Sequence, residues 1–175
     1  MDTRVKTRFV PRRGHRMARG GTPWTPYVSR VAATPIDERV QAPGDIYRLS
    51  LDMIDLQQEQ LRVVLLDPGN RLLGIHLVYQ GTVDSITVCL ADLFREAIRV
   101  GATALALVHN HPTGRTDQPS PSDLLLTVEA LRAGQLLGIA VIDHVIVARE
   151  APGYFSILNM ARGGPDVPAP PPTPA

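Results

Sequence analysis

The stretch Thr-Ala-Leu-Ala-Leu-Val-His-Asn-His-Pro, at residues 103–112, decides the fold. Its first six residues form an almost wholly apolar run, which is typical of a strand buried on both faces in the middle of a sheet. Pro112 lacks an amide hydrogen, so regular strand pairing must end there. Because side chains alternate along a strand, His109 and His111 are predicted to project from the same side of the strand end.

Helical and strand periodicities surround this central strand. The predicted elements are a helix over about 45–57, a β-hairpin of strands 61–66 and 71–79, a helix between Leu90 and Gly101, a helix marked by Leu124, Val128 and Leu131, and a buried strand over 139–147. Helices that alternate with apolar strands predict an α/β domain built on a mixed sheet.

The two ends of the chain differ in composition from the middle. Residues 1–43 are rich in Arg, Gly, Pro and Thr and are predicted to be a basic, disordered arm. Residues 162–175 are rich in proline and are predicted to be a disordered tail, partly in the polyproline II conformation. Residues 44–161 are then predicted to form one domain, since a chain of 175 residues leaves little room for a second core.

Charge and cysteine content restrict the class of protein. Eighteen Lys and Arg against 17 Asp and Glu argue against strong attraction to nucleic acid or to an anionic membrane. The Arg-rich start nevertheless leaves open a weak nucleic-acid contact or a mitochondrial transit peptide. A single cysteine, Cys89, cannot form an internal disulfide and is expected to be a small buried residue. Without a secretory signal or an apolar run of about 20 residues, a soluble cytoplasmic protein is expected.

A second pattern follows the histidines, in Pro119-Ser120-Pro121-Ser122-Asp123. Ser120 as the N-cap, Pro121 in the first helical position and Asp123 two residues later form a capping box, which by itself explains these residues. The intervening loop contains Gly and Pro and can fold the start of this helix back over the strand end, so that Asp123 offers an oxygen to the same ion. Two imidazoles and a carboxylate suit one Zn²⁺ per chain and leave a fourth position for water.

His144 and Asp117 each have competing interpretations. His144 beside Asp143 could form a second metal site or a base with its orienting acid, but it lies within a predicted buried strand and is expected to be a hydrogen-bonded structural histidine. Asp117 lies in the loop between the histidines and Ser120 and is an alternative to Asp123 as a ligand.

The arrangement of residues 109–114 and 119–123 resembles the JAMM (MPN-type) metalloprotease motif, in particular that of RadC-like proteins. The resemblance covers about residues 43–160 and includes segments 65–67, 70–72, 81–83, 136–139, 143–146 and 153–156. It implies a single cytidine-deaminase-like α/β domain with a mixed sheet flanked by helices. It also implies a zinc metallopeptidase or isopeptidase-like hydrolase that acts on a peptide or protein.

The resemblance assigns roles residue by residue. His109, His111 and Asp123 match the metal ligands, Glu59 matches the catalytic glutamate that activates water, and Ser120 matches the serine that stabilises the oxyanion. Two features depart from the family pattern: the loop between Gly114 and Pro119 is one residue longer, and residues 1–43 resemble no helix-hairpin-helix region.

Two other functions remain as alternatives. The basic arm could make the chain a nucleic-acid-associated DNA-repair or mobile-element accessory factor. The domain could also be a non-catalytic MPN scaffold, although the intact set of Glu59, His109, His111 and Asp123 counts against that interpretation. The sequence specifies neither the substrate nor the oligomeric state.

Overall fold

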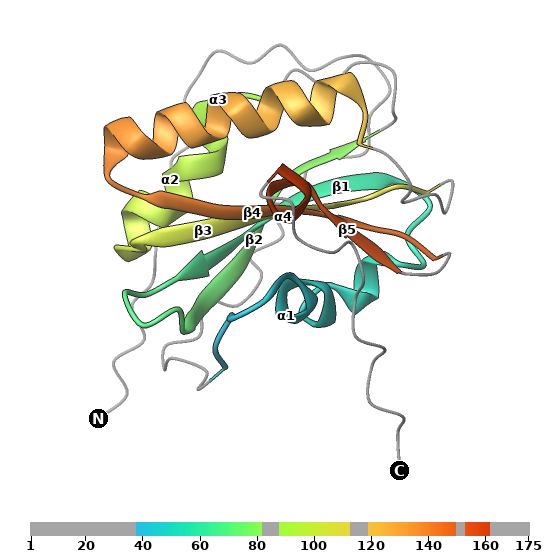
Figure 1. Ribbon diagram of the computed structural model, residues 1–175, viewed down its shortest axis with the longest axis horizontal. Coiled ribbons are helices and arrows are strands. Elements are labelled where there is room, and N and C mark those ends of the chain that lie inside the picture. Colours follow the sequence, from blue (N-terminus) through green and yellow to red (C-terminus); the bar gives the residue numbers. More distant parts are fainter. Residues whose placement is uncertain (1–37, 82–87, 113–118, 150–152, 162–175) are drawn as a thin grey trace, which may run out of the picture.

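The computed structural model describes residues 38–81, 88–112, 119–149 and 153–161. Their strands form one five-stranded sheet in the order β2-β1-β3-β4-β5 (Figure 1). The strands are β1 (Glu59–Leu66), β2 (Leu72–Gly81), β3 (Ala104–Asn110), β4 (Ala140–Val147) and β5 (Tyr154–Ser156). Only β3 and β4 run parallel, and the other neighbours are antiparallel. The mixed sheet confirms the predicted fold class and places the strand that carries the histidines at its centre.

Helices cover both faces of this sheet (Figure 1). They are α1 (Pro43–Arg48), the 3₁₀ turn η1 (Leu51–Met53), α2 (Leu90–Val100), α3 (Pro121–Leu137) and α4 (Ile157–Ala161). On one face, Phe94 of α2 and Ala130 of α3 pack with Leu105 and Leu107 of β3. On the other, Ile46 packs with β3 residues such as Val108. None of the helices in these described segments has the length and apolar character needed to cross a bilayer.

The β1–β2 hairpin forms as predicted. The Asp67 carboxylate accepts hydrogen bonds from the backbone N–H groups of Gly69 and Arg71, at 2.7 and 2.8 Å. Asn70 adopts the left-handed conformation, with φ of 57°, which asparagine tolerates better than most residues. The turn aligns β1 so that six of its residues, from Leu61 to Leu66, also pair with β3.

The helix expected over 45–57 is shorter than predicted. It ends at Arg48, and a 3₁₀ turn follows, because Ser50 N–H bonds to the Tyr47 carbonyl and Met53 N–H bonds to the Ser50 carbonyl, each three residues back. Ile46 and Met53 are nonetheless both buried against the sheet. The apolar spacing therefore reflected burial of the whole segment rather than one continuous helix.

The inward face of α3 also differs from the expected one. Leu124 and Val128, two of the three residues that marked the helix in the sequence, are exposed, whereas the third, Leu131, is partly buried and packs against the core. The buried residues are Asp123, Thr127, Ala130 and Gly134. These side chains are small or polar because α3 lies close to the sheet: a Cβ on Gly134 would lie 2.5 Å from the Ile139 carbonyl oxygen. This close approach brings the first turn of α3 to the end of β3.

Gly134→Ala is expected to destabilise the protein by about 1–3 kcal/mol because the new methyl group meets backbone that cannot move aside freely. This change in the free energy of unfolding is opposite to the usual one, since alanine in a helix interior normally stabilises a protein by about 1 kcal/mol relative to glycine. Urea unfolding measures the free energy difference, with Gln135→Ala at the exposed neighbouring position as the control. An unchanged or higher midpoint for Gly134→Ala would contradict the close packing of α3.

Cys89 is exposed, so its expected burial was wrong. It occupies the N-cap position of α2, and its carbonyl accepts the N–H of Asp92. The first buried residues of that helix, Leu93 and Phe94, come one turn later. The N-cap residue Cys89 comes before the part of α2 that packs on the core, and its side chain therefore lies at the surface.

Candidate metal centre

The two histidines lie at the end of the central strand of the sheet. β3 pairs with β1 on one side and with β4 on the other, and His109 is 2% exposed. His111 follows the last residue of β3, and its backbone N–H bonds to the Val147 carbonyl at 3.1 Å. Pairing on both sides fixes the backbone of His109, and the bond to Val147 fixes that of His111, before any ligand binds.

The start of α3 forms the capping box that the sequence predicted. The Ser120 hydroxyl oxygen accepts the Asp123 backbone N–H at 3.2 Å, and Asp123 Oδ2 accepts the Ser120 N–H at 2.8 Å and the Ser120 hydroxyl at 2.7 Å. These bonds fix one carboxylate oxygen. The other oxygen, Oδ1, lies 3.3 Å from His109 Nε2. The cap and a metal-binding role are therefore compatible, because the cap aims the carboxylate at the histidines.

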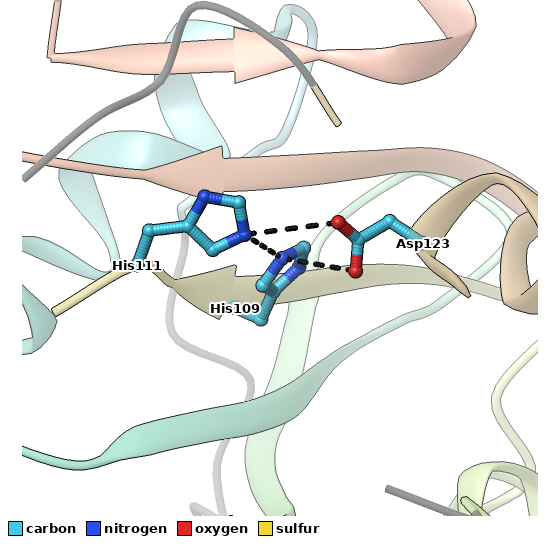
Figure 2. Close-up of side chains that lie close together, drawn as sticks. All are labelled: His109, His111 and Asp123. Carbon is cyan, nitrogen blue, oxygen red and sulfur yellow. Dashed lines mark hydrogen bonds and ion pairs between the residues drawn. The ribbon is translucent and has the colours of Figure 1, made fainter. Parts of the chain in front are cut away.

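The side chains of His109, His111 and Asp123 converge (Figure 2). The two Nε2 atoms are 2.9 Å apart, and His111 Nε2 lies 3.7 Å from Asp123 Oδ2. Ligands about 2.0–2.1 Å from a tetrahedral zinc ion lie roughly 3.3 Å from one another. The observed separations are 2.9 Å between the two nitrogens, 3.3 Å from His109 to one carboxylate oxygen and 3.7 Å from His111 to the other, close to that value. Within the described residues this is the single group of three potential ligands that can hold a metal ion.

Asp123 is ionised in this setting. Burial of its carboxyl group opposes ionisation, but the two imidazoles and the Ser120 hydroxyl outweigh burial and hold the pKa of Asp123 well below its usual range. A carboxylate that keeps its charge between two imidazoles is a suitable ligand for a divalent cation. The donor set thus fits zinc in type, in separation and in charge.

Glu59 lies outside this close group of three residues. It is the first residue of β1 and is partly buried. Leu61, two residues later, pairs with His109, and it packs on the same face of the sheet as Leu105 and Leu107. Since side chains alternate along a strand, Glu59 belongs to the face from which His109 projects. The register therefore assigns its side chain to the face of the sheet that carries the candidate ligands.

Asn110 holds the backbone on both sides of Glu59. Its Oδ1 accepts the Gln60 N–H at 2.8 Å, and its Nδ2 donates to the Gln58 carbonyl at 3.1 Å. The side chain between the two histidines thus bonds to both peptide groups that flank the glutamate. Asn110 therefore serves in hydrogen bonding to the backbone of β1 and the residue before it.

His144 is buried and hydrogen-bonded, as expected, but its partners belong to the candidate metal centre. Its Nε2 lies 2.9 Å from His109 Nδ1, and its Nδ1 lies 2.6 Å from the Thr127 hydroxyl. Burial, followed by the charges of nearby His109 and His111, lowers the pKa of His144 well below its usual value, so the ring is neutral. Sequence reasoning missed this contact, and it also missed Thr127.

The neighbouring Asp143 has a structural role. Its carboxylate accepts hydrogen bonds from the Ser156 hydroxyl, at 2.8 and 2.9 Å, and from the Leu158 N–H at 3.3 Å, where α4 begins. The ring nitrogens of His144 bond to His109 and Thr127 instead. The alternative of a base with Asp143 as its orienting acid is therefore not what the structure forms. Asp117 and the loop of unusual length lie outside the described residues.

Comparison with known proteins gives a consistent result. The model of the RadC-like JAB domain family matches residues 40–163. A UPF0758 protein of Chloroflexus aggregans is 42% identical over 137 residues, which are 77% of this chain and 58% of the relative. UPF0758 proteins of Trichormus variabilis and Thermotoga maritima are 44% and 37% identical over 65% and 69% of this chain, and 45% and 53% of the relatives.

The matched region contains every helix and strand described above, and the chain spans about half the length of these relatives. The fold agrees with this match, since the model has a single mixed sheet flanked by helices. The histidines and the aspartate that carried the resemblance in the sequence converge at one point. The chain belongs to the RadC-like JAB domain family.

Proposed function

We propose that this protein is a zinc-dependent metallohydrolase that cleaves an amide bond, as a metallopeptidase or an isopeptidase-like enzyme. The observation that carries the proposal is the convergence of two imidazole Nε2 atoms and an ionised carboxylate at the end of a central strand. Membership of the RadC-like JAB domain family supports it. His109, His111 and Asp123 would hold the metal.

A metal bound by these residues would supply Lewis-acid chemistry, polarising a carbonyl group and lowering the pKa of water. Glu59 then serves as the general base: it takes a proton from the attacking water and passes it to the departing amine. The backbone on both sides of Glu59 is held by Asn110, so the side chain extends from a fixed point of the sheet. A peptide or protein is the proposed substrate because residues 109–123 resemble the JAMM metalloprotease motif, and the amine released from such a bond would take up this proton.

Ser120 is proposed to stabilise the oxyanion that forms on the substrate. Its hydroxyl now donates to Asp123 Oδ2, and its backbone N–H donates to the same oxygen. If the hydroxyl turns toward a substrate oxygen, the backbone bond still holds Asp123 in place. Ser120 can therefore serve both the helix cap and the reaction.

The test is hydrolysis of a mixed library of peptides, some linked through the lysine ε-amino group, by the full chain with zinc content measured in parallel. We expect about one zinc per chain, and amide cleavage that disappears with a chelator and returns with added zinc. Cleavage that a chelator does not affect, or protein that takes up no zinc when it is supplied, would refute the proposal.

A further inference from the structure

A chain of hydrogen bonds connects the backbone of α3 to the candidate ligand His109. The Thr127 hydroxyl lies 2.6 Å from the Asp123 carbonyl oxygen and 2.6 Å from His144 Nδ1. His144 Nε2 lies 2.9 Å from His109 Nδ1. The Thr127, His144 and His109 side chains are 2%, 0% and 2% exposed, so water does not replace any of these partners.

The direction of this chain follows from its first member. A backbone carbonyl can only accept a hydrogen bond, so the single hydroxyl hydrogen of Thr127 is directed at the Asp123 oxygen. The hydroxyl oxygen must then accept from His144, which places the proton of His144 on Nδ1. Nε2 of that neutral ring has only its lone pair and accepts from His109.

We propose that Thr127 and His144 are positioning residues that hold the ring proton of His109 on Nδ1 and so leave its Nε2 as the metal-binding nitrogen. This inference rests on the proposed function, because it concerns a ligand of the proposed metal. Metal-binding histidines usually donate their second ring nitrogen to a carboxylate, a carbonyl or water. In this protein a second histidine, itself oriented through a threonine, occupies that position.

The arrangement has an electrostatic consequence at the site. With the His109 proton on Nδ1, the Nε2 lone pair faces the Asp123 Oδ1 at 3.3 Å. In this tautomer His109 does not donate the Nε2 hydrogen bond that contributes to the low pKa of Asp123, and a cation between the two atoms would supply the positive charge in its place. The same bonds that orient His109 therefore favour a metal over an internal hydrogen bond to Asp123.

Replacement of Thr127 by valine keeps the branched shape and removes the hydroxyl. His144 Nδ1–H then loses its buried acceptor, and the ring is expected to move its proton to Nε2. Nε2–H would donate to His109 Nδ1 and shift the His109 proton onto the metal-binding nitrogen. Zinc binding by Thr127→Val should weaken about 10- to 100-fold. Thr127→Ser retains a hydroxyl and should bind zinc like the wild type.

Two measurements on the full chain test this. Competition with a chromophoric chelator gives the zinc Kd of the wild type, Thr127→Val and Thr127→Ser, with Thr103→Val as the matched control at an exposed threonine before β3. Long-range ¹H–¹⁵N correlation spectra of the metal-free protein, at a pH where the rings are neutral, report which nitrogen of His109 carries the proton. A His109→Gln variant assigns that ring.

The expected result is an Nδ1 proton on His109 in the wild type and in Thr127→Ser, and an Nε2 proton with weaker zinc binding in Thr127→Val alone. A wild-type His109 proton on Nε2, or a folded Thr127→Val that binds zinc as tightly as the wild type, overturns the inference. Absence of zinc binding by the wild type would instead refute the proposed function. The ring-proton measurement on the metal-free wild type still decides the inference in that case, and also if Thr127→Val fails to fold.

Discussion

Asp123→Ala is expected to purify with almost no zinc, whereas the wild type should hold about one ion per chain. Four-ligand structural zinc sites bind with about 10–16 kcal/mol, so each protein ligand contributes on the order of 3–4 kcal/mol, or two to three orders of magnitude in Kd. Asp123 is the only carboxylate in the convergent group within the described residues. Its loss leaves two imidazoles and no negative charge in the group, which hold a divalent cation weakly. Atomic emission of dialysed protein measures the metal content.

The variant also loses part of the α3 cap, which costs about 0.5–2 kcal/mol of stability. Asp92→Ala is the matched control because Asp92 occupies the equivalent third position of α2. Asp123→Asn retains the size and an oxygen but loses the charge, and it too should lose most of the metal. Equal zinc in the wild type and in a folded Asp123→Ala would show that the metal is held elsewhere.

Local signals in the sequence were sufficient for most of the elements. Gly101, with positive φ, ends α2 where the sequence predicted the end of that helix. Ser120 and Asp123 form the predicted cap. Each of these features depends only on residues within one helical turn, so it can be predicted from a short stretch of sequence. The central position of the strand that carries His109 could also be predicted from the sequence, because a wholly apolar strand must be buried on both faces.

The inward face of α3 could not be predicted from apolar periodicity. The helix approaches the sheet through Thr127, Ala130 and Gly134, which are too small or too polar to form an apolar stripe. The larger Leu124 and Val128 point outward and suggested the wrong face. Close packing selects small residues, and only the position of β4 reveals that the packing is close.

The contact between His109 and His144 depends on register between strands that are far apart in sequence. β3 and β4 pair so that His144 lies opposite Leu107, one pleat away from His109 on the same face. A shift of one residue would turn His144 to the opposite face of the sheet. The sequence therefore predicted a buried, hydrogen-bonded histidine but not its partner. The contact of Asn110 with the backbone around Glu59 depends on the pairing of β1 with β3 in the same way.

Glu59→Gln is expected to lower amide hydrolysis by about 10²–10⁴-fold, the usual contribution of a general acid or base. Glutamine has nearly the same shape, but its amide cannot take a proton from water. Zinc content should remain that of the wild type, because Glu59 lies outside the convergent group of ligands. Hydrolysis of the peptide library, with atomic emission on the same preparations, measures both quantities.

This separation of effects distinguishes a base from a ligand. If Glu59 held the metal, its replacement would lower zinc content and activity together, as Asp123→Ala should. If Glu59 were only a solvated carboxylate at the start of β1, Glu59→Gln would behave like Glu129→Gln, the same change at an exposed position of α3. Full activity in Glu59→Gln would therefore require another proton acceptor, and the assignment of the base would be wrong. Loss of activity with retained zinc is the result that the strand register supports, since β1 and β3 direct Glu59 and His109 to the same face of the sheet.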